Sequence, residues 1–150
     1  MKHEFKIEIH SEEDTINLAK TIAPELEFGD VVALYGELGT GKTFLTQWIC
    51  RFLGVKEYTS SPSYVLVNEY IGKFPICHVD LYRLDSINEV LELGLYEIFE
   101  KNLTFIEWAE KAKKLLPENT IHIRLKFKNS HRNVKVQSYK KLRLGEPLSD

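Results

Sequence analysis

Residues 31–43 of the chain read Val31-Val32-Ala33-Leu34-Tyr35, followed at once by Gly36-Glu37-Leu38-Gly39-Thr40-Gly41-Lys42-Thr43. Its first five residues form a short apolar run with two β-branched side chains, which predicts a strand buried on both faces. The next eight match the pattern G-x-x-x-x-G-K-[ST] in full. Residues 42–53 carry apolar side chains at helical spacing, and Gly54 is a plausible helix stop. The sequence therefore predicts a phosphate-binding loop between a buried strand and a helix.

The residue types in this loop suit a nucleoside triphosphate. Glycines let the backbone turn tightly and aim successive N–H groups at phosphate oxygens, and the following helix adds its positive N-terminal end. Lys42 would reach the β- and γ-phosphates, and the Thr43 hydroxyl would ligate magnesium. We therefore expect ATP or ADP with Mg²⁺ as ligands. The expected nucleotide contacts here are Gly36, Glu37, Leu38, Gly39, Thr40, Gly41, Lys42, Thr43 and Phe44.

Two acidic residues are candidates for holding the metal or its waters. A phosphate-loop site needs an acid at the end of a neighbouring strand. Asp80 follows the segment 76–79 and Glu107 follows the apolar segment 103–106, although the pattern alone allows each to be an ordinary strand-end acid. A hydroxyl-rich loop, which is either a plain turn or a γ-phosphate sensor, consists of Ser60, Ser61, Pro62 and Ser63.

The rest of the chain predicts one α/β domain over residues 1–150, with a mostly parallel central sheet, an antiparallel hairpin and helices on both faces. Ser11 is expected to cap a helix that ends near Pro24. Residues 145–150 are expected to form a loose tail. Further strands are expected at residues 5–9, 64–70, 74–79, 103–106, 120–128 and around 134–136, and further short helices at residues 86–91 and 108–116.

Composition excludes several classes of protein. The chain has 150 residues, 43% hydrophobic and 28% charged, with a net charge of −2, so it has neither the composition of a disordered chain nor a global basic footprint. A basic C-terminal third, which includes Arg132, is either a solvated face or a local patch. No apolar stretch approaches a membrane span and no signal peptide is visible, so we expect no membrane association and a cytoplasmic location.

Cysteine and histidine usage gives no metal or disulfide pattern. Cys50 and Cys77 lie in apolar runs without paired spacing, which predicts small buried hydrophobes of a reducing compartment. The histidines share no spacing, so a histidine metal site is not expected; they are His3, His10, His78, His122 and His131.

Four motifs in order resemble a known family. They are the phosphate loop, Ser61-Pro62-Ser63-Tyr64, His78-Val79-Asp80-Leu81-Tyr82-Arg83 and Ile106-Glu107-Trp108. From about residue 11 to residue 125, the chain resembles the TsaE (YjeE) family, the small ATPase of bacterial tRNA threonylcarbamoyladenosine biosynthesis. The family's Ser-Pro-Thr is Ser-Pro-Ser here, which keeps the hydroxyl and drops a methyl group.

The resemblance implies a P-loop α/β fold, binding of ATP with magnesium, and slow ATP hydrolysis by the protein alone. It also implies that the protein works with TsaD and TsaB, which transfer a threonylcarbamoyl group to an adenosine beside the anticodon, so that tRNA is met indirectly through that complex. Hydrolysis would reset the complex between turnovers.

The resemblance further implies roles for single residues. Thr43 and Glu107 would ligate magnesium. Asp80 would orient the attacking water or a metal-bound water, and with Lys42 it would be catalytic. Trp108 would buttress the site. The expected nucleotide contacts then also include Ser11, Trp108 and a switch-like pair, Ser61 and Ser63.

Three alternatives remain from the residues themselves. A small-molecule kinase usually has an arginine-rich lid, and the sequence shows none between Arg51 and Arg124 apart from Arg83. A GTPase is disfavoured because no Asn is followed by Lys. The third is a non-catalytic, nucleotide-gated binding module. Because neither Arg51 nor Arg83 is clearly placed as an arginine finger, slow intrinsic turnover accelerated by a partner is expected.

Overall fold

The structure is a computed structural model that describes residues 2–57 and 66–144. The predicted switch-like loop with Ser61 and Ser63 and the predicted loose tail lie outside the described residues. None of the helices in the described part of the chain is both long and apolar enough to cross a membrane.

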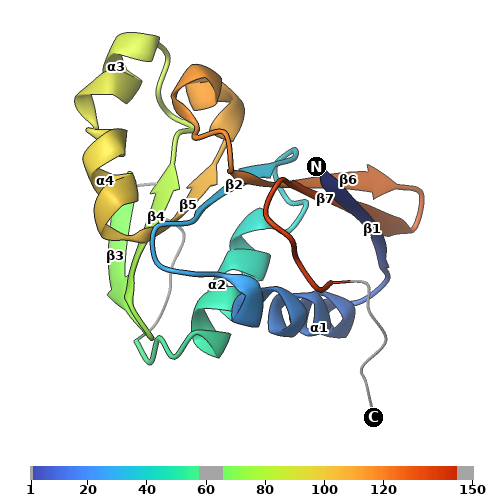
Figure 1. Cartoon of the computed structure of the whole chain (residues 1–150). Helices are drawn as coiled ribbons and strands as arrows, with labels where there is room; N and C mark the ends of the chain where they lie inside the picture. Colours follow the sequence, from blue (N-terminus) through green and yellow to red (C-terminus); the bar gives the residue numbers. More distant parts are fainter. Residues whose placement is uncertain (1, 58–65, 145–150) are drawn as a thin grey trace.

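A seven-stranded mixed sheet runs through the molecule in the order β1-β7-β6-β2-β5-β4-β3 (Figure 1). The strands β6, β2, β5 and β4 are parallel to one another, and antiparallel pairs flank them on both sides. The expected α/β fold is thereby confirmed. The strand bounds are β1 His3–Ile9, β2 Val31–Tyr35, β3 Val67–Ile71, β4 Pro75–Asp80, β5 Leu103–Glu107, β6 Ile121–Lys128 and β7 His131–Ser138.

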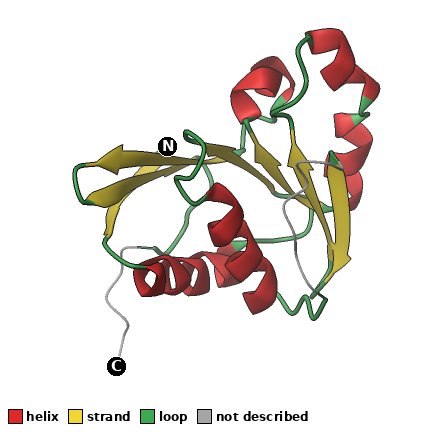
Figure 2. Cartoon of the chain, turned by 180° about the vertical axis from the view of Figure 1, so that it is seen from behind, coloured by secondary structure: helices red, strands yellow, loops and turns green. Residues whose placement is uncertain are grey.

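Helices cover both faces of the sheet, as expected (Figure 2). On one face α1 (Glu12–Ile22) and α2 (Lys42–Phe52) pack on the larger apolar cluster, together with the 3₁₀ helix η1 (Ala23–Glu25). On the other face lie α3 (Ile87–Glu92), α4 (Leu95–Lys101) and the 3₁₀ helix η2 (Ala109–Leu115). Strand β2 is buried along four of its five residues because both layers cover it.

Local sequence explains where the helices begin and end. Ser11 is the N-cap of α1, and its hydroxyl accepts a hydrogen bond from the Asp14 amide at 3.1 Å. Pro24 marks the change from α1 to η1, because proline cannot donate to the helix ladder. Gly41 precedes α2 in a left-handed conformation that glycine adopts without steric cost.

Two elements differ from the sequence expectations. Helix α4 was not anticipated; it is only seven residues long and its buried residues are Leu95 and Phe99, which leaves little periodic signal. The helix expected over residues 108–116 is a 3₁₀ helix interrupted at Ala112, whose φ and ψ of −121° and 23° are not helical.

Candidate functional site

The phosphate loop follows the C-terminal end of β2 and leads into α2. Gly36 and Gly41 have φ values of 149° and 105°, which favour glycine. At Gly36 there is also no space for a side chain, since a Cβ atom would lie 2.6 Å from the Thr40 hydroxyl and 2.7 Å from the Leu125 carbonyl oxygen. No side chain caps the N-terminus of α2. The amide groups of its first turn therefore face the loop without a side-chain partner, as anion binding requires.

Lys42 folds back over its own loop. Its ammonium donates hydrogen bonds to the carbonyl oxygens of Gly36 and, at 3.2 Å, of Glu37. It also lies 4.6 Å from the centre of the Trp108 ring, as in a cation–π contact. Burial lowers the pKa of Lys42, whereas the nearby carboxylates, first that of Glu107, act in the opposite direction. The ammonium is thus held inside the loop, where phosphate oxygens would sit.

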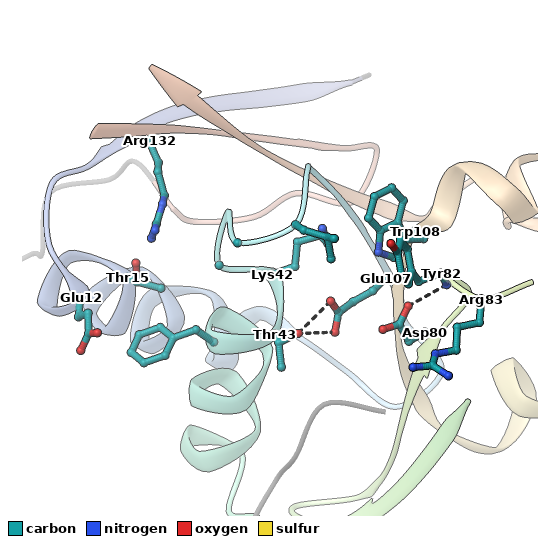
Figure 3. A pocket seen from close by; sticks show the side chains of 14 residues that line it. Glu12, Thr15, Lys42, Thr43, Asp80, Tyr82, Arg83, Glu107, Trp108 and Arg132 are labelled. Atoms are coloured by element: carbon teal, nitrogen blue, oxygen red, sulfur yellow. Dashed lines mark hydrogen bonds between the residues drawn. The ribbon is translucent and has the colours of Figure 1, made fainter. Parts of the chain in front are cut away.

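Glu107, the last residue of β5, faces the first turn of α2. The Thr43 hydroxyl donates to both of its carboxylate oxygens, at 3.0 Å each (Figure 3). From the other side His78 Nε2 contacts Glu107 Oε2 at 2.6 Å. Glu107 and His78 are 3% and 1% exposed. This buried chain of contacts fixes the orientation of the carboxylate toward Thr43.

Asp80 ends the neighbouring strand β4 and stands directly opposite Glu107 in the sheet register. One of its oxygens accepts a hydrogen bond from the Tyr82 amide at 2.9 Å. Burial is the main cause that raises the pKa of Asp80; the Glu107 charge adds to this and the Tyr82 hydrogen bond opposes it. A partly desolvated carboxylate beside a second one is a suitable acceptor for a water proton.

These groups share one cavity of about 560 Å³. Figure 3 shows Lys42 and Thr43 between two arginines that approach from different elements: Arg132 from β7 and Arg83 from the segment after β4. The Arg83 segment is held by Lys111, whose ammonium donates to the carbonyl oxygens of Tyr82 and Leu84 at 2.6 and 2.8 Å. The cavity is therefore lined by both cations and carboxylates, with Lys42 and Glu107 between the two arginines (Figure 3).

The structure brings most of the sequence candidates together. Lining the cavity are Leu38, Gly39, Gly41, Lys42, Thr43, Phe44, Asp80, Glu107 and Trp108. Gly36, Glu37 and Thr40 instead line a second cavity on the β6 side of the loop. Ser11 is the cap of α1 and does not line the cavity, although the following residue, Glu12, does. Trp108 itself has a left-handed φ of 58°, which turns the chain sharply after Glu107.

Sequence reasoning missed three kinds of site residue. His78 was considered as a metal ligand and as part of the motif over residues 78–83, without a role in the site, yet a lone imidazole two residues before Asp80 in a buried strand signals a need for a polar partner. Arg132 was counted with the basic C-terminal third. The third kind is the α1 side of the cavity, Glu12 and Thr15, for which the sequence gives no signal.

The donor set is compatible with magnesium. No group of three or more His, Cys, Asp or Glu residues within residues 2–57 and 66–144 forms a metal cage. Magnesium in nucleotide sites does not need one, since it takes one or two protein oxygens and completes its shell with phosphates and water. The Thr43 hydroxyl and the Glu107 carboxylate would be those oxygens.

Comparison with known proteins assigns the chain to a family. The family model described as "Threonylcarbamoyl adenosine biosynthesis protein TsaE" matches residues 9–135. The tRNA threonylcarbamoyladenosine biosynthesis protein TsaE of Rickettsia bellii is 45% identical over 79% of this chain and 84% of its own. The protein of the same name from Bacillus subtilis is 35% identical over 76% of this chain and 72% of its own.

A solved structure agrees. The crystal structure of Bacillus subtilis YdiB superposes with a TM-score of 0.78 at 28% identity, covering 92% of this chain and 87% of that one. The chain therefore belongs to the TsaE family, whose members are proteins of tRNA threonylcarbamoyladenosine biosynthesis.

Proposed function

We propose that this protein binds ATP with Mg²⁺ in the cavity beside the phosphate loop, and that it hydrolyses ATP slowly in support of tRNA threonylcarbamoyladenosine synthesis. The observation that carries the proposal is the contact between the Thr43 hydroxyl and the Glu107 carboxylate, 3.0 Å apart and next to Lys42. A hydroxyl and a carboxylate at the N-terminus of a helix that no side chain caps form the donor set that Mg²⁺ with triphosphate requires.

The phosphates would occupy the loop. Its glycines expose backbone amides, the N-terminus of α2 supplies positive potential, and the Lys42 ammonium would leave the carbonyl oxygens of Gly36 and Glu37 for phosphate oxygens. The second end of the cavity, next to Glu12, Thr15 and Phe44, would take the nucleoside. Arg132 lies between these two regions, with its guanidinium beside Gly41.

Asp80 is the proposed acceptor for the proton of the attacking water. Asp80 is 4% exposed and stands opposite Glu107 in the sheet register. In this proposal Asp80 accepts the proton, and Glu107, at the end of the adjacent strand, would hold magnesium. Magnesium, when bound, neutralises the charge on the phosphates. Arg83 lines the same end of the cavity as Asp80 and is the chain's own candidate for contacting the terminal phosphate.

The partners that we propose are TsaD and TsaB, with hydrolysis resetting their complex between turnovers. Family membership supports this assignment. Slow turnover by the isolated chain follows from the expectation that a partner completes the site.

The test is Mg²⁺-dependent ATP hydrolysis by the purified protein with and without TsaB–TsaD from the same organism. We expect stimulation of at least about ten-fold, since groups supplied by a partner accelerate phosphate-loop enzymes by about 10³- to 10⁵-fold, and no activity above background for Lys42→Ala in either condition. Rapid hydrolysis by the isolated protein would contradict slow intrinsic turnover. Transfer of phosphate to a small acceptor, without stimulation, would identify a kinase instead.

A further inference from the structure

One face of the sheet is left open where β1, β7 and β6 lie. Figures 1 and 2 show α1 and α2 beneath these strands. The helices of the opposite layer, α3, α4 and η2, form an apolar cluster with side chains of β2, β4 and β5 but with none of β1, β6 or β7. Within the part of the chain that the structure describes, no helix therefore covers this face of the three strands.

A basic groove runs across the open face. The groove has a volume of about 760 Å³, and its charged residues are five cations and one carboxylate, which gives it a net charge of +4 in a chain whose net charge is −2. The charged residues are Lys6, Arg124, Lys126, Lys128, Lys135 and Glu8. Positive charge is thus concentrated here rather than spread over the surface.

Cations of neighbouring strands stand opposite one another in the sheet register. Lys135 of β7 stands directly opposite Lys6 of β1 on one side and Arg124 of β6 on the other. Like charges in this position disfavour the pairing of strands. Glu4 contacts Lys135 at 3.5 Å and Lys6 at 4.0 Å and so offsets part of this repulsion.

The β6 cations lack such compensation. Among the residues that the structure describes, no carboxylate lies within 4 Å of Arg124, Lys126 or Lys128. The groove carboxylate, Glu8, contacts His10 and His131 instead. A ligand with several negative charges would therefore gain three unneutralised cations on one strand.

We propose that this groove binds the sugar–phosphate backbone of RNA, and specifically tRNA, so that the protein contacts the nucleic acid directly. Arg124, Lys126 and Lys128 alternate along β6 and project about 7 Å apart on one face, a spacing similar to that of successive phosphates. Of the groove residues only Ile7 and Val134 are apolar. Interfaces between proteins have an apolar core, whereas interfaces with nucleic acids are polar and positively charged, so the lining favours RNA over an acidic protein.

The proposal draws on membership of a tRNA-modification family and not on ATP hydrolysis. The groove residues lie outside the cavity that holds Lys42, Thr43 and Glu107. RNA binding can therefore be measured without nucleotide, and its failure would leave the ATPase proposal untouched.

The experiment measures binding of a labelled, unmodified tRNA transcript to the full-length protein at several salt concentrations. The test variant is Lys126→Glu/Lys128→Glu, with Lys126→Gln/Lys128→Gln as a milder form. The matched control is Lys56→Glu/Lys73→Glu, which makes the same change of charge at two exposed residues near the opposite edge of the sheet. The melting temperature of each variant checks that it folds.

We expect the groove reversal to weaken tRNA binding by about ten-fold or more at low salt and to reduce the slope of log K against log salt by about two, one for each phosphate contact. The control pair should change the slope by much less. Equal losses in the two pairs, or the absence of tRNA binding by the unaltered protein, would overturn the proposal. Loss of TsaB–TsaD binding without any change in tRNA binding would also overturn it, because the groove would then serve an acidic protein surface.

Discussion

Thr43 and Glu107 lie 64 residues apart in the chain, yet the Thr43 hydroxyl is 3.0 Å from each oxygen of the Glu107 carboxylate. The contact exists because β2 and β5 are parallel neighbours, so that the helix that follows β2 begins beside the end of β5. Strand β4 is the next neighbour and brings Asp80 opposite Glu107. The loop and both acids thus lie together at the carboxyl ends of the parallel strands, where ligands of open α/β folds bind.

Replacing Thr43 by valine removes the hydroxyl and keeps the shape of the side chain. We expect ATP hydrolysis at saturating Mg²⁺ to fall by about 10- to 100-fold, since a hydrogen bond with a charged partner contributes about 1.5–3 kcal/mol. The control is Thr46→Val one turn later, whose hydroxyl donates to the Lys42 carbonyl oxygen at 2.9 Å. This change should lower stability by about 1 kcal/mol and leave hydrolysis in place. Equal losses of activity would show that the Thr43 hydroxyl has no special role.

Asp80→Asn tests the role of proton acceptor. The change is nearly isosteric, so we expect ATP affinity to be preserved while single-turnover hydrolysis falls by about 10²- to 10⁴-fold. Asp85→Asn, at an exposed residue of the segment that follows, is the control. If TsaB–TsaD output stays unchanged while hydrolysis is lost, the protein is a nucleotide-gated module rather than an enzyme of the pathway. Joint loss of affinity and hydrolysis would place Asp80 in binding instead.

Trp108 should report nucleotide binding by its fluorescence. The chain has two tryptophans, and the Lys42 ammonium lies 4.6 Å from the ring of Trp108. Phosphates bound in the loop would draw the Lys42 ammonium away from the Trp108 ring and so change the fluorescence emission of Trp108. Trp48 is in α2 between Phe44 and Phe52, with ring centres 6.5 and 5.8 Å away. We expect Trp48→Phe to keep the ATP-induced change and Trp108→Phe to abolish it; the reverse pattern would refute the assignment.

His122 should titrate below its ordinary pKa of 6.5, first because it is half-buried and second because Arg124 is near. A lowered pKa in the folded state means that the folded protein binds the proton less well than the unfolded chain. This contribution to stability is therefore complete above the unfolded value and is lost as pH falls through 6.5 toward the folded pKa. Proton NMR of the imidazole gives the midpoint, and Arg124→Gln should raise it. A midpoint at or above 6.5 would contradict the burial argument.

Much of the fold was predictable because its strands are short and strongly patterned. Strand β2 is a continuous apolar run, and α1 begins after a serine that caps it. In both cases the local sequence preference agrees with the structure that forms. Helix α4 was not predictable, since a single turn of buried side chains after Gly94 gives no period to detect. The β1–β7 pairing joins the two ends of the chain, and no local pattern encodes such a partner.

The residues of the site also fall into those that could be predicted from the sequence and those that could not. The loop and the two strand-end acids were predictable because each motif is local and parallel strands end at one edge. Arg132 was not, because its position beside the loop depends on the antiparallel pairing of β7 with β6, far from any motif. Ser11 caps α1 as expected, and its expected contact with the nucleotide stays a prediction; the next residue, Glu12, lines the cavity. Of the two arginines considered in the sequence as an arginine finger, Arg83 lines the cavity, whereas Arg51 lies 4.9 Å from the centre of the Trp48 ring in α2.

A calorimetric titration of ATP, with and without Mg²⁺, into the unaltered protein and into Glu107→Gln tests directly whether Glu107 holds magnesium. We expect Mg²⁺ to strengthen ATP binding to the unaltered protein by about ten-fold or more, because Thr43 and Glu107 would hold the ion beside the triphosphate. In Glu107→Gln, the binding of ATP without Mg²⁺ should persist and the gain from Mg²⁺ should largely vanish. An equal gain from Mg²⁺ in both proteins would contradict a role for Glu107 in magnesium binding, since the metal would then be held elsewhere.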